Sequence, residues 1–195
     1  MNRIRTVLAA AGLTLAASPS FAHIGVGVTS SFAAGFQHPL FGLDHVTVMI
    51  AVGLWAALKG GRALWAWPAA FVGVMLVGGA LGMAHVPIPL VEPGILASVV
   101  ALGLLVAVAA DLPIGVGAII IGAFALLHGH AHGTEVPENA GGLEYIAGFA
   151  LATAGLHGIG IAMALGLGTR FRGLVRAAGA LCAVIGLGLA VGIVG

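Results

Sequence analysis

Histidine and acidic side chains gather in two short segments of an otherwise apolar chain, residues 38–45 and 128–135. Imidazole nitrogen and carboxylate oxygen are suitable ligands for a borderline divalent cation such as nickel, cobalt or zinc. Ionisable groups within apolar segments are costly and usually serve a function. The two segments therefore predict metal binding, and their candidate ligands are His38, Asp44, His45, His128, His130, His132 and Glu135.

The first segment lies at the start of a long apolar stretch, where Asp44 is also a candidate helix cap. A helix from Asp44 to Leu58 would be about 22 Å long, short of a hydrocarbon core of about 30 Å. We therefore expect the helix to begin near Pro39, with His38 at its cap. That start places Asp44 and His45 inside the span.

In a regular helix, His38 and His45 share a face but lie about 10 Å apart along the axis. One ion with bonds of about 2 Å does not bridge that distance. Either Gly42 permits an unwound turn, or the two histidines belong to successive sites. Met49, one turn beyond His45, is either a soft ligand or a core residue.

The second segment has helical spacing. On a helix, His128, His132 and Glu135 form one stripe, because they are separated by four and then three positions. His130 then points to the opposite face. In an extended segment, all three histidines would align instead. The alternative without a metal is a helix end whose histidines meet water at the membrane interface.

Two further histidines are candidate ligands. His157 lies in the middle of the fifth apolar stretch, where it is either bonded to a neighbouring helix or a relay ligand below the outer sites. His23 would chelate an ion together with a free α-amino group, if cleavage made it the first residue. By contrast, His85 and Glu92 flank a proline-rich loop and are expected to be solvated.

The composition defines the class of protein. Of 195 residues, 61% are apolar and 7% are charged, and the mean hydropathy is +1.18. Soluble chains carry roughly 25% charged residues, and a net charge of +1 offers no phosphate-binding surface. Cys182, the single cysteine, forms neither an internal disulfide nor a cysteine-based zinc site. These values predict an all-α protein in the lipid bilayer and exclude soluble enzymes, disordered chains and nucleic-acid binders.

Residues 1–22 are typical of a cleaved secretory signal peptide. Arg3 and Arg5 precede the apolar stretch 6–17, and Ser20-Phe21-Ala22 has the small-x-small pattern of a cleavage site. An uncleaved anchor is the alternative, although the stretch is shorter than the roughly 20 residues that cross a bilayer. The mature part, residues 23–195, is predicted to be a single transmembrane domain with its N-terminus outside the cytoplasm.

Six apolar stretches predict six transmembrane helices, at residues 38–58, 64–84, 93–110, 112–131, 143–168 and 173–194. With the N-terminus outside, the first and fifth connections lie in the cytoplasm. Basic residues gather there, as the positive-inside rule requires. A bacterial inner membrane is the simplest location, and both histidine segments then face the periplasm. The basic residues are Lys59, Arg62, Arg170, Arg172 and Arg176.

These features together resemble the HupE/UreJ family of bacterial nickel permeases. The His-x5-Asp-His pattern of that family is matched at residues 38–45, and its His-Gly-x-Ala-His-Gly-x-Glu pattern at residues 128–135. Leu127 stands where the family is expected to have an aromatic residue. The resemblance covers the whole chain and implies uptake of nickel or cobalt for hydrogenase or urease. The metal would be cargo, and no resident cofactor is expected.

Two other function classes remain open from the residues alone. The first is an intramembrane zinc hydrolase, although the chain lacks His-Glu-x-x-His and Gly-x-Ser-Gly motifs. The second is a metal-sensing subunit that passes no ion. Oligomeric state is also open, because Gly188-x-x-x-Gly192 and Gly78-x-x-x-Gly82 would pack helices either within one subunit or between subunits of a homo-oligomer.

Overall fold

A computed structural model describes residues 31–136 and 141–193 of the chain. The predicted signal peptide and His23 lie outside the described residues. Within them the structure is helical throughout. Its elements are α2 (Ser31–Gln37), η1 (His38–Leu40), α3 (Leu43–Lys59), α4 (Ala63–Met83), α5 (Val91–Ala107), α6 (Ile114–Thr134), α7 (Gly142–Leu167), η2 (Thr169–Phe171) and α8 (Arg172–Ala190).

Each of the six predicted stretches contains one long helix, α3 to α8. Among the described residues, four segments are long and apolar enough to cross a membrane, namely α4, α6, α7 and Thr169–Ala190. A fifth is added if the α2–η1 segment and α3, bent by 80°, form one broken span. Helix α5 is apolar but has only 17 residues. The described residues thus form an all-helical membrane protein, for which six spans remain a prediction.

The prediction of a continuous helix from Pro39 is wrong. Pro39 lies in the short 3-10 helix η1, the chain is extended at Gly42 (φ −84°, ψ 115°), and α3 begins only at Leu43. Asp44 is therefore in the first turn of α3. An unwound turn at Gly42 was the alternative, and the structure has it. The physical reason is that α2 and η1 pack against α7. Helix α3 therefore begins as a separate helix, bent by 80° from the α2–η1 segment.

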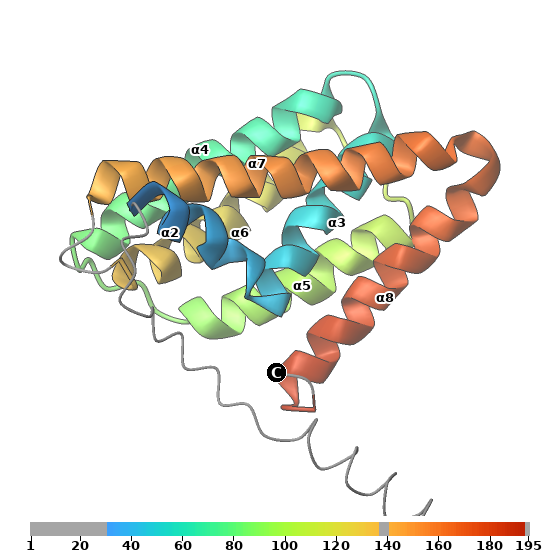
Figure 1. Cartoon of the computed structure of the whole chain (residues 1–195). Coiled ribbons are helices and arrows are strands. Elements are labelled where there is room, and N and C mark those ends of the chain that lie inside the picture. Colours follow the sequence, from blue (N-terminus) through green and yellow to red (C-terminus); the bar gives the residue numbers. More distant parts are fainter. Residues whose placement is uncertain (1–30, 137–140, 194–195) are drawn as a thin grey trace, which may run out of the picture.

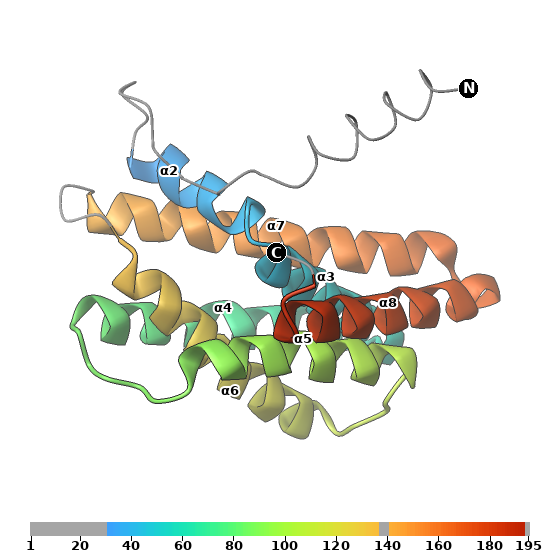
Figure 2. The same ribbon diagram turned by 90° about the horizontal axis from the view of Figure 1, so that it is seen from below.

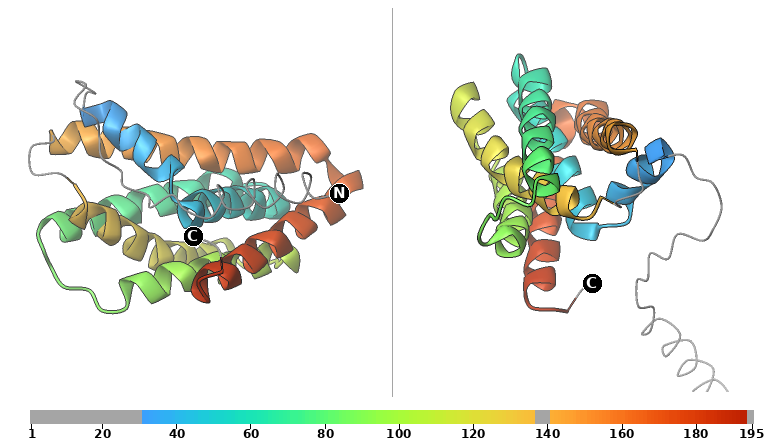
Figure 3. Two further views of the ribbon diagram at one scale, coloured as in Figure 1. Left: turned by 60° about the horizontal axis from the view of Figure 1, so that its bottom comes forward. Right: turned by 90° about the vertical axis from the view of Figure 1, so that its left-hand side faces the viewer.

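Helix α3 lies at the centre of the molecule. It contacts α4, α5, α7 and α8, and Figure 3 shows it between α7 on one side and α5 and α8 on the other. Its 17 residues rise about 25 Å, less than a hydrocarbon core of about 30 Å. From Val48 to Ala56 the side chains are almost completely buried, except for the partly buried Ile50. A short helix is sufficient here because protein, rather than lipid, surrounds most of α3.

The connections divide the molecule into two ends (Figure 1). The turns α3–α4, α5–α6 and α7–α8 lie at one end, and the α4–α5 connection, the end of α6 and the start of α7 lie at the other. At the first end, the Lys59 ammonium forms an ion pair with the Asp111 carboxylate, and Arg176 donates a hydrogen bond to the Ala107 carbonyl. We call this the basic end. The histidine segments lie at the opposite end, which we call the histidine end.

Helix α2 lies across the start of α7, as Figure 2 shows. The two backbones approach closely at Gly35 and Gly148. A Cβ atom at Gly35 would lie 2.0 Å from the Tyr145 carbonyl oxygen, and one at Gly148 would lie 2.1 Å from that of Phe32. Small residues permit such contact between membrane helices. This packing fixes η1, and therefore His38, beside the histidine end of α7.

Helices α4 and α6 pack along their whole length with backbone contacts. Gly78 and Gly82 face the Leu126 and His130 carbonyls of α6, so this glycine pair packs within one subunit. On α6, a Cβ atom at Gly129 would lie 1.9 Å from the Met75 carbonyl oxygen. These contacts hold the histidine segment of α6 against α4.

The Gly129→Ala variant is therefore expected to unfold at a lower temperature than the wild type. The added methyl group meets rigid backbone, so α4 and α6 must separate, and overpacking of this kind costs about 1–3 kcal/mol. Thermal unfolding of the purified protein in detergent measures the change. Gly73→Ala on α4 is the matched control, since a Cβ atom there meets nothing within 4 Å. Equal unfolding temperatures for the two variants would contradict the tight α4–α6 contact.

Candidate metal centre

A cavity of about 550 Å³ opens at the histidine end of the molecule. It lies where η1, the first turn of α3, the start of α5 and the end of α6 meet. Candidate ligands from both sequence segments line it, so the structure brings together groups that are far apart in the chain. The lining residues are His38, Phe41, Gly42, Asp44, His45, Glu92, Ile95, Ala131, His132 and Glu135.

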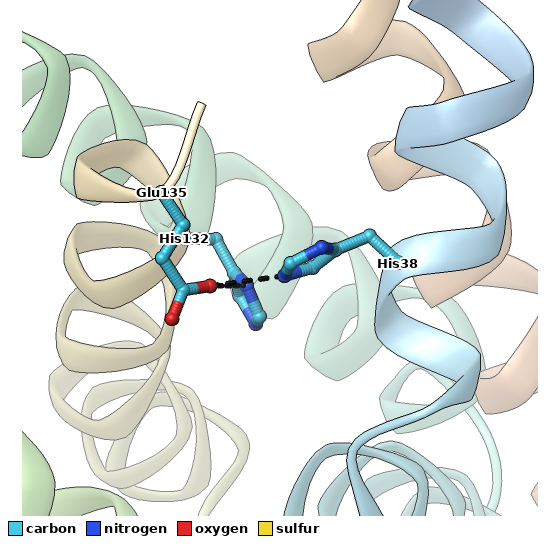
Figure 4. Close-up of side chains that lie close together, drawn as sticks. All are labelled: His38, His132 and Glu135. Atoms are coloured by element: carbon cyan, nitrogen blue, oxygen red, sulfur yellow. Dashed lines mark hydrogen bonds and ion pairs between the residues drawn. The ribbon is translucent and has the colours of Figure 1, made fainter. Parts of the chain in front are cut away.

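The outer part of this cavity holds three candidate ligands, which we call the mouth group: His38, His132 and Glu135 (Figure 4). One ligand atom from each lies within 4.8 Å of the other two. The Glu135 carboxylate accepts hydrogen bonds from His38 Nε2 at 3.0 Å and from His132 Nδ1 at 3.2 Å. The bonds from His132 and His38 hold the pKa of the Glu135 carboxyl well below its usual range. The Glu135 carboxylate of the mouth group is therefore ionised at neutral pH.

Glu135 reaches the mouth group because it follows the last residue of α6. Its backbone N–H bonds to the His132 carbonyl as the C-cap of the helix. The carboxylate then turns back over the final turn toward His132. Figure 4 shows it between the end of α6 and the His38 ring, which comes from η1.

A second set of imidazoles lies deeper, and we call it the inner group: His45, His128 and His132. His45 Nε2 lies 2.8 Å from His128 Nδ1 and 2.5 Å from His132 Nε2. All three side chains are buried, and His128 is completely so. Helix α3 contributes one ring and α6 the other two, one turn apart, as the i, i+4 spacing predicts.

The outer hydrogen bonds of these rings fix which nitrogen carries the proton. His45 donates from Nδ1 to the Asp44 carboxylate at 3.1 Å. Ser98 donates its hydroxyl proton to the Ile95 carbonyl, so it accepts from His128 Nε2 at 2.8 Å. In the neutral rings, His45 Nε2 and His128 Nδ1 consequently face each other with unshared electron pairs.

His132 completes the same pattern, because it donates from Nδ1 to Glu135 and directs the electron pair of Nε2 at His45. Three imidazole electron pairs thus point into one buried space, and each ring is held from behind by an oxygen acceptor. Such an arrangement is repulsive by itself and favourable around a cation. The donor set, nitrogen with nearby carboxylate, fits Ni²⁺, Co²⁺ or Zn²⁺.

The two groups share His132. One of its nitrogens faces the mouth group and the other faces the inner group. His38 and His45 therefore belong to successive groups rather than to one ion, and the unwound turn at Gly42 lies between them. Asp44 contributes indirectly, since its Oδ1 accepts both the backbone N–H and the Nδ1–H of His45.

The remaining predicted ligands lie elsewhere. His130 points away from the cavity and donates from Nε2 to the Val86 carbonyl at 2.7 Å. His157 is buried deeper in the bundle on α7. Met49 is completely buried in the hydrophobic core. His23 is not among the described residues.

Sequence reasoning missed four residues at this site. Ser98 orients His128, and Glu92, expected only to be solvated, lines the cavity. Phe149 packs on His132 with ring centroids 4.4 Å apart, and Tyr145 lies edge-on to His38 at 6.0 Å. For Ser98 a signal existed, namely a lone hydroxyl in an otherwise apolar helix. Nothing in the local pattern distinguishes the two aromatic residues from ordinary core.

The sequence is similar to known proteins over almost its whole length. The sequence model of the family described as HupE / UreJ protein matches residues 11–189. The chain belongs to the HupE/UreJ family. It is also 45% identical over 193 residues to Protein HupE of Rhizobium leguminosarum bv. viciae, a match that covers 98% of each chain. No solved structure matches it. The HupE/UreJ family is associated with nickel and cobalt uptake for hydrogenase and urease.

Proposed function

We propose that this HupE/UreJ protein is an inner-membrane permease that takes up Ni²⁺, or Co²⁺, through the mouth and inner groups. The observation that carries the proposal is the convergence of three imidazole electron pairs beneath an open cavity whose mouth is anionic. A transport site needs donors that replace the water around the ion. It also needs binding weak enough for release, which mixed nitrogen and oxygen ligands supply better than thiolates.

The ion moves inward in two steps in this proposal. Glu135, Asp44 and Glu92 attract the cation into the cavity, where the Glu135 carboxylate, held by His38 and His132, replaces part of its water. The ion then moves past the His132 side chain, from the mouth group near Nδ1 to the inner group near Nε2. There it meets the facing nitrogens of His45 and His128, which carry no proton in the tautomers described above. Uptake runs from the histidine end to the basic end.

The orientation of the protein rests on charge. Lys59, Arg62, Arg170, Arg172 and Arg176 lie in or beside the α3–α4 and α7–α8 turns, at the basic end. The positive-inside rule places that end in the cytoplasm. The cavity then opens to the periplasm, on the side where external metal arrives.

Reconstitution of the purified full chain into liposomes tests the proposal. Ni²⁺, Co²⁺ and Zn²⁺ are supplied outside in turn, with and without a pH gradient, and a chelating dye reports entry. We expect saturable Ni²⁺ influx in these proteoliposomes, with none in protein-free liposomes. The absence of influx for all three metals would overturn the proposal. Stoichiometric zinc retained without flux would favour the intramembrane hydrolase, since three histidines are also a catalytic zinc set.

A further inference from the structure

His157 is the least satisfied buried polar side chain in the part of the chain that the structure describes. It lies in the middle of α7 and is 1% exposed. Neither Nδ1 nor Nε2 has a hydrogen-bond partner among the described residues. A neutral imidazole always has one N–H to donate, and burying that N–H without a partner destabilises the folded protein.

Other buried polar side chains of this bundle find partners. The indole N–H groups of Trp55 and Trp67 donate to the Ala110 and Ile114 carbonyls, both at 2.9 Å. His130 also has one unpaired nitrogen, but its other nitrogen is bonded to a carbonyl. The lack of a partner at His157 is therefore not a general property of this interior. Unsatisfied buried groups of this kind call for an explanation.

The surroundings of His157 contain further donor atoms. Thr153 lies one turn before His157 on the same face of α7. The Thr153 hydroxyl donates to the Met75 thioether sulfur at 3.7 Å. Met75 and Phe71 are likewise one turn apart on α4, and the Phe71 ring meets the His157 ring edge-on at 5.1 Å. An imidazole, a hydroxyl and a thioether thus occupy the facing surfaces of α4 and α7.

The Phe71 ring also connects this region to the inner group. Its centroid lies 5.9 Å from that of His128 and 5.1 Å from that of His157. One completely buried aromatic side chain therefore separates the inner group from the next imidazole toward the basic end. Beyond them, the Trp55 and Trp67 rings pack together at 4.3 Å.

The backbone around His157 is held firmly. A Cβ atom at Gly53 of α3 would lie 2.2 Å from the His157 carbonyl oxygen, and one at Gly160 would lie 2.3 Å from that of Ile50. This contact leaves α7 no room to shift relative to α3. These backbone contacts fix the segment of α7 that carries the His157 side chain.

We propose that His157 is a deeper binding station for the transported cation, reached from the inner group when the Phe71 ring turns aside. The inference rests on the proposed function, because the station receives the ion that the outer groups deliver. An unpaired imidazole supplies an electron pair to a borderline divalent cation, and Thr153 and Met75 supply weaker oxygen and sulfur donors. Because the station has only one strong donor, the ion is weakly bound there, which allows its release toward the cytoplasm.

His157→Leu in the full chain separates this role from a packing role. We expect Ni²⁺ influx into proteoliposomes to fall about tenfold or more, as for loss of a group that supports a metal. The unfolding temperature in detergent is expected to stay equal to that of the wild type or to rise, because an unpaired polar group is removed. Ni²⁺ affinity of the outer groups, measured by titration calorimetry, should be unchanged.

His130→Leu is the matched control, since it also replaces a buried histidine. His130→Leu removes the hydrogen bond to the Val86 carbonyl, so we expect it to lower the unfolding temperature. The folded variant should still transport Ni²⁺. If His157→Leu is not recovered from membranes, His157→Gln takes its place, with the same expected loss of influx. A His157 variant that transports at the wild-type rate would overturn the inference, as would parallel losses of stability and influx. If the wild type itself admits no Ni²⁺, the proposed function fails instead.

Discussion

His132→Ala is expected to abolish Ni²⁺ uptake. His132 is the only described side chain in both the mouth and the inner group, with Nδ1 3.2 Å from Glu135 and Nε2 2.5 Å from His45. Its removal takes the Nδ1–H hydrogen bond from Glu135 in the mouth group and the Nε2 electron pair from the inner group. We expect the initial influx rate into proteoliposomes to fall about 100-fold or more, the upper range for groups that support a metal site.

His38→Ala provides the comparison within the mouth group. His38 contacts Glu135 and the edge of His132, and about a third of its side chain is exposed. Because the proposed path gives His38 a role only in capture of the ion, its loss should raise the apparent KM more than it lowers the maximal rate. A maximal rate equal to that of His132→Ala would contradict the two-group arrangement.

His130→Gln is the control for the helix itself. His130 lies two residues before His132 on α6, but it bonds to the Val86 carbonyl, and glutamine retains a donor for that bond. This variant should transport at close to the wild-type rate. If it lost uptake as completely as His132→Ala, damage to α6 rather than loss of a ligand would explain both results.

The approximate positions of the six long helices could be predicted because each long apolar stretch is bounded by glycine, proline or charge. The i, i+4 relation between His128 and His132 also follows from sequence, since helical periodicity fixes neighbours within one element. The approach of residues 38–45 to residues 128–135 was predicted from topology alone. The structure brings these segments together through His45.

What could not be predicted depends on contacts between elements. Helix α2 has seven residues, too few for a hydropathy signal, and it is positioned by the close approach of Gly35 to α7. The break at Gly42 follows from that packing, so the local sequence suggested a continuous helix instead. Similarly, Ser98 and Phe71 become important only through rings on other helices.

Substitution of Asp44 should distinguish a ligand from a positioning residue. Its Oδ1 accepts the backbone N–H of His45 at 2.8 Å and the ring Nδ1–H at 3.1 Å. In a positioning role, Asp44→Asn keeps an oxygen acceptor and loses only the charge, whereas Asp44→Leu loses both hydrogen bonds. We therefore expect Ni²⁺ uptake to fall about tenfold for the asparagine variant and about 100-fold for the leucine variant.

A direct ligand role predicts a different pattern. Both substitutions remove the anionic oxygen, so they would reduce uptake to a similar degree. Ring ¹⁵N chemical shifts of His45 give an independent readout, because they distinguish a proton on Nδ1 from one on Nε2. In Asp44→Leu we expect the proton to move to Nε2, where it points at His128 and His132 and occupies the position proposed for the metal.

Glu144→Gln is the matched charge control for this series. Glu144 lies in the first turn of α7, is exposed and does not line the cavity. Like Asp44→Asn, the Glu144→Gln substitution removes one negative charge from the histidine end of the molecule. It should leave Ni²⁺ uptake close to the wild-type rate. Equal losses in Glu144→Gln and Asp44→Asn would mean that general attraction of cations, rather than the hydrogen bond to His45, explains the importance of Asp44. A graded loss together with a changed His45 tautomer would instead establish that the Asp44 hydrogen bond directs the electron pair of His45 into the inner group.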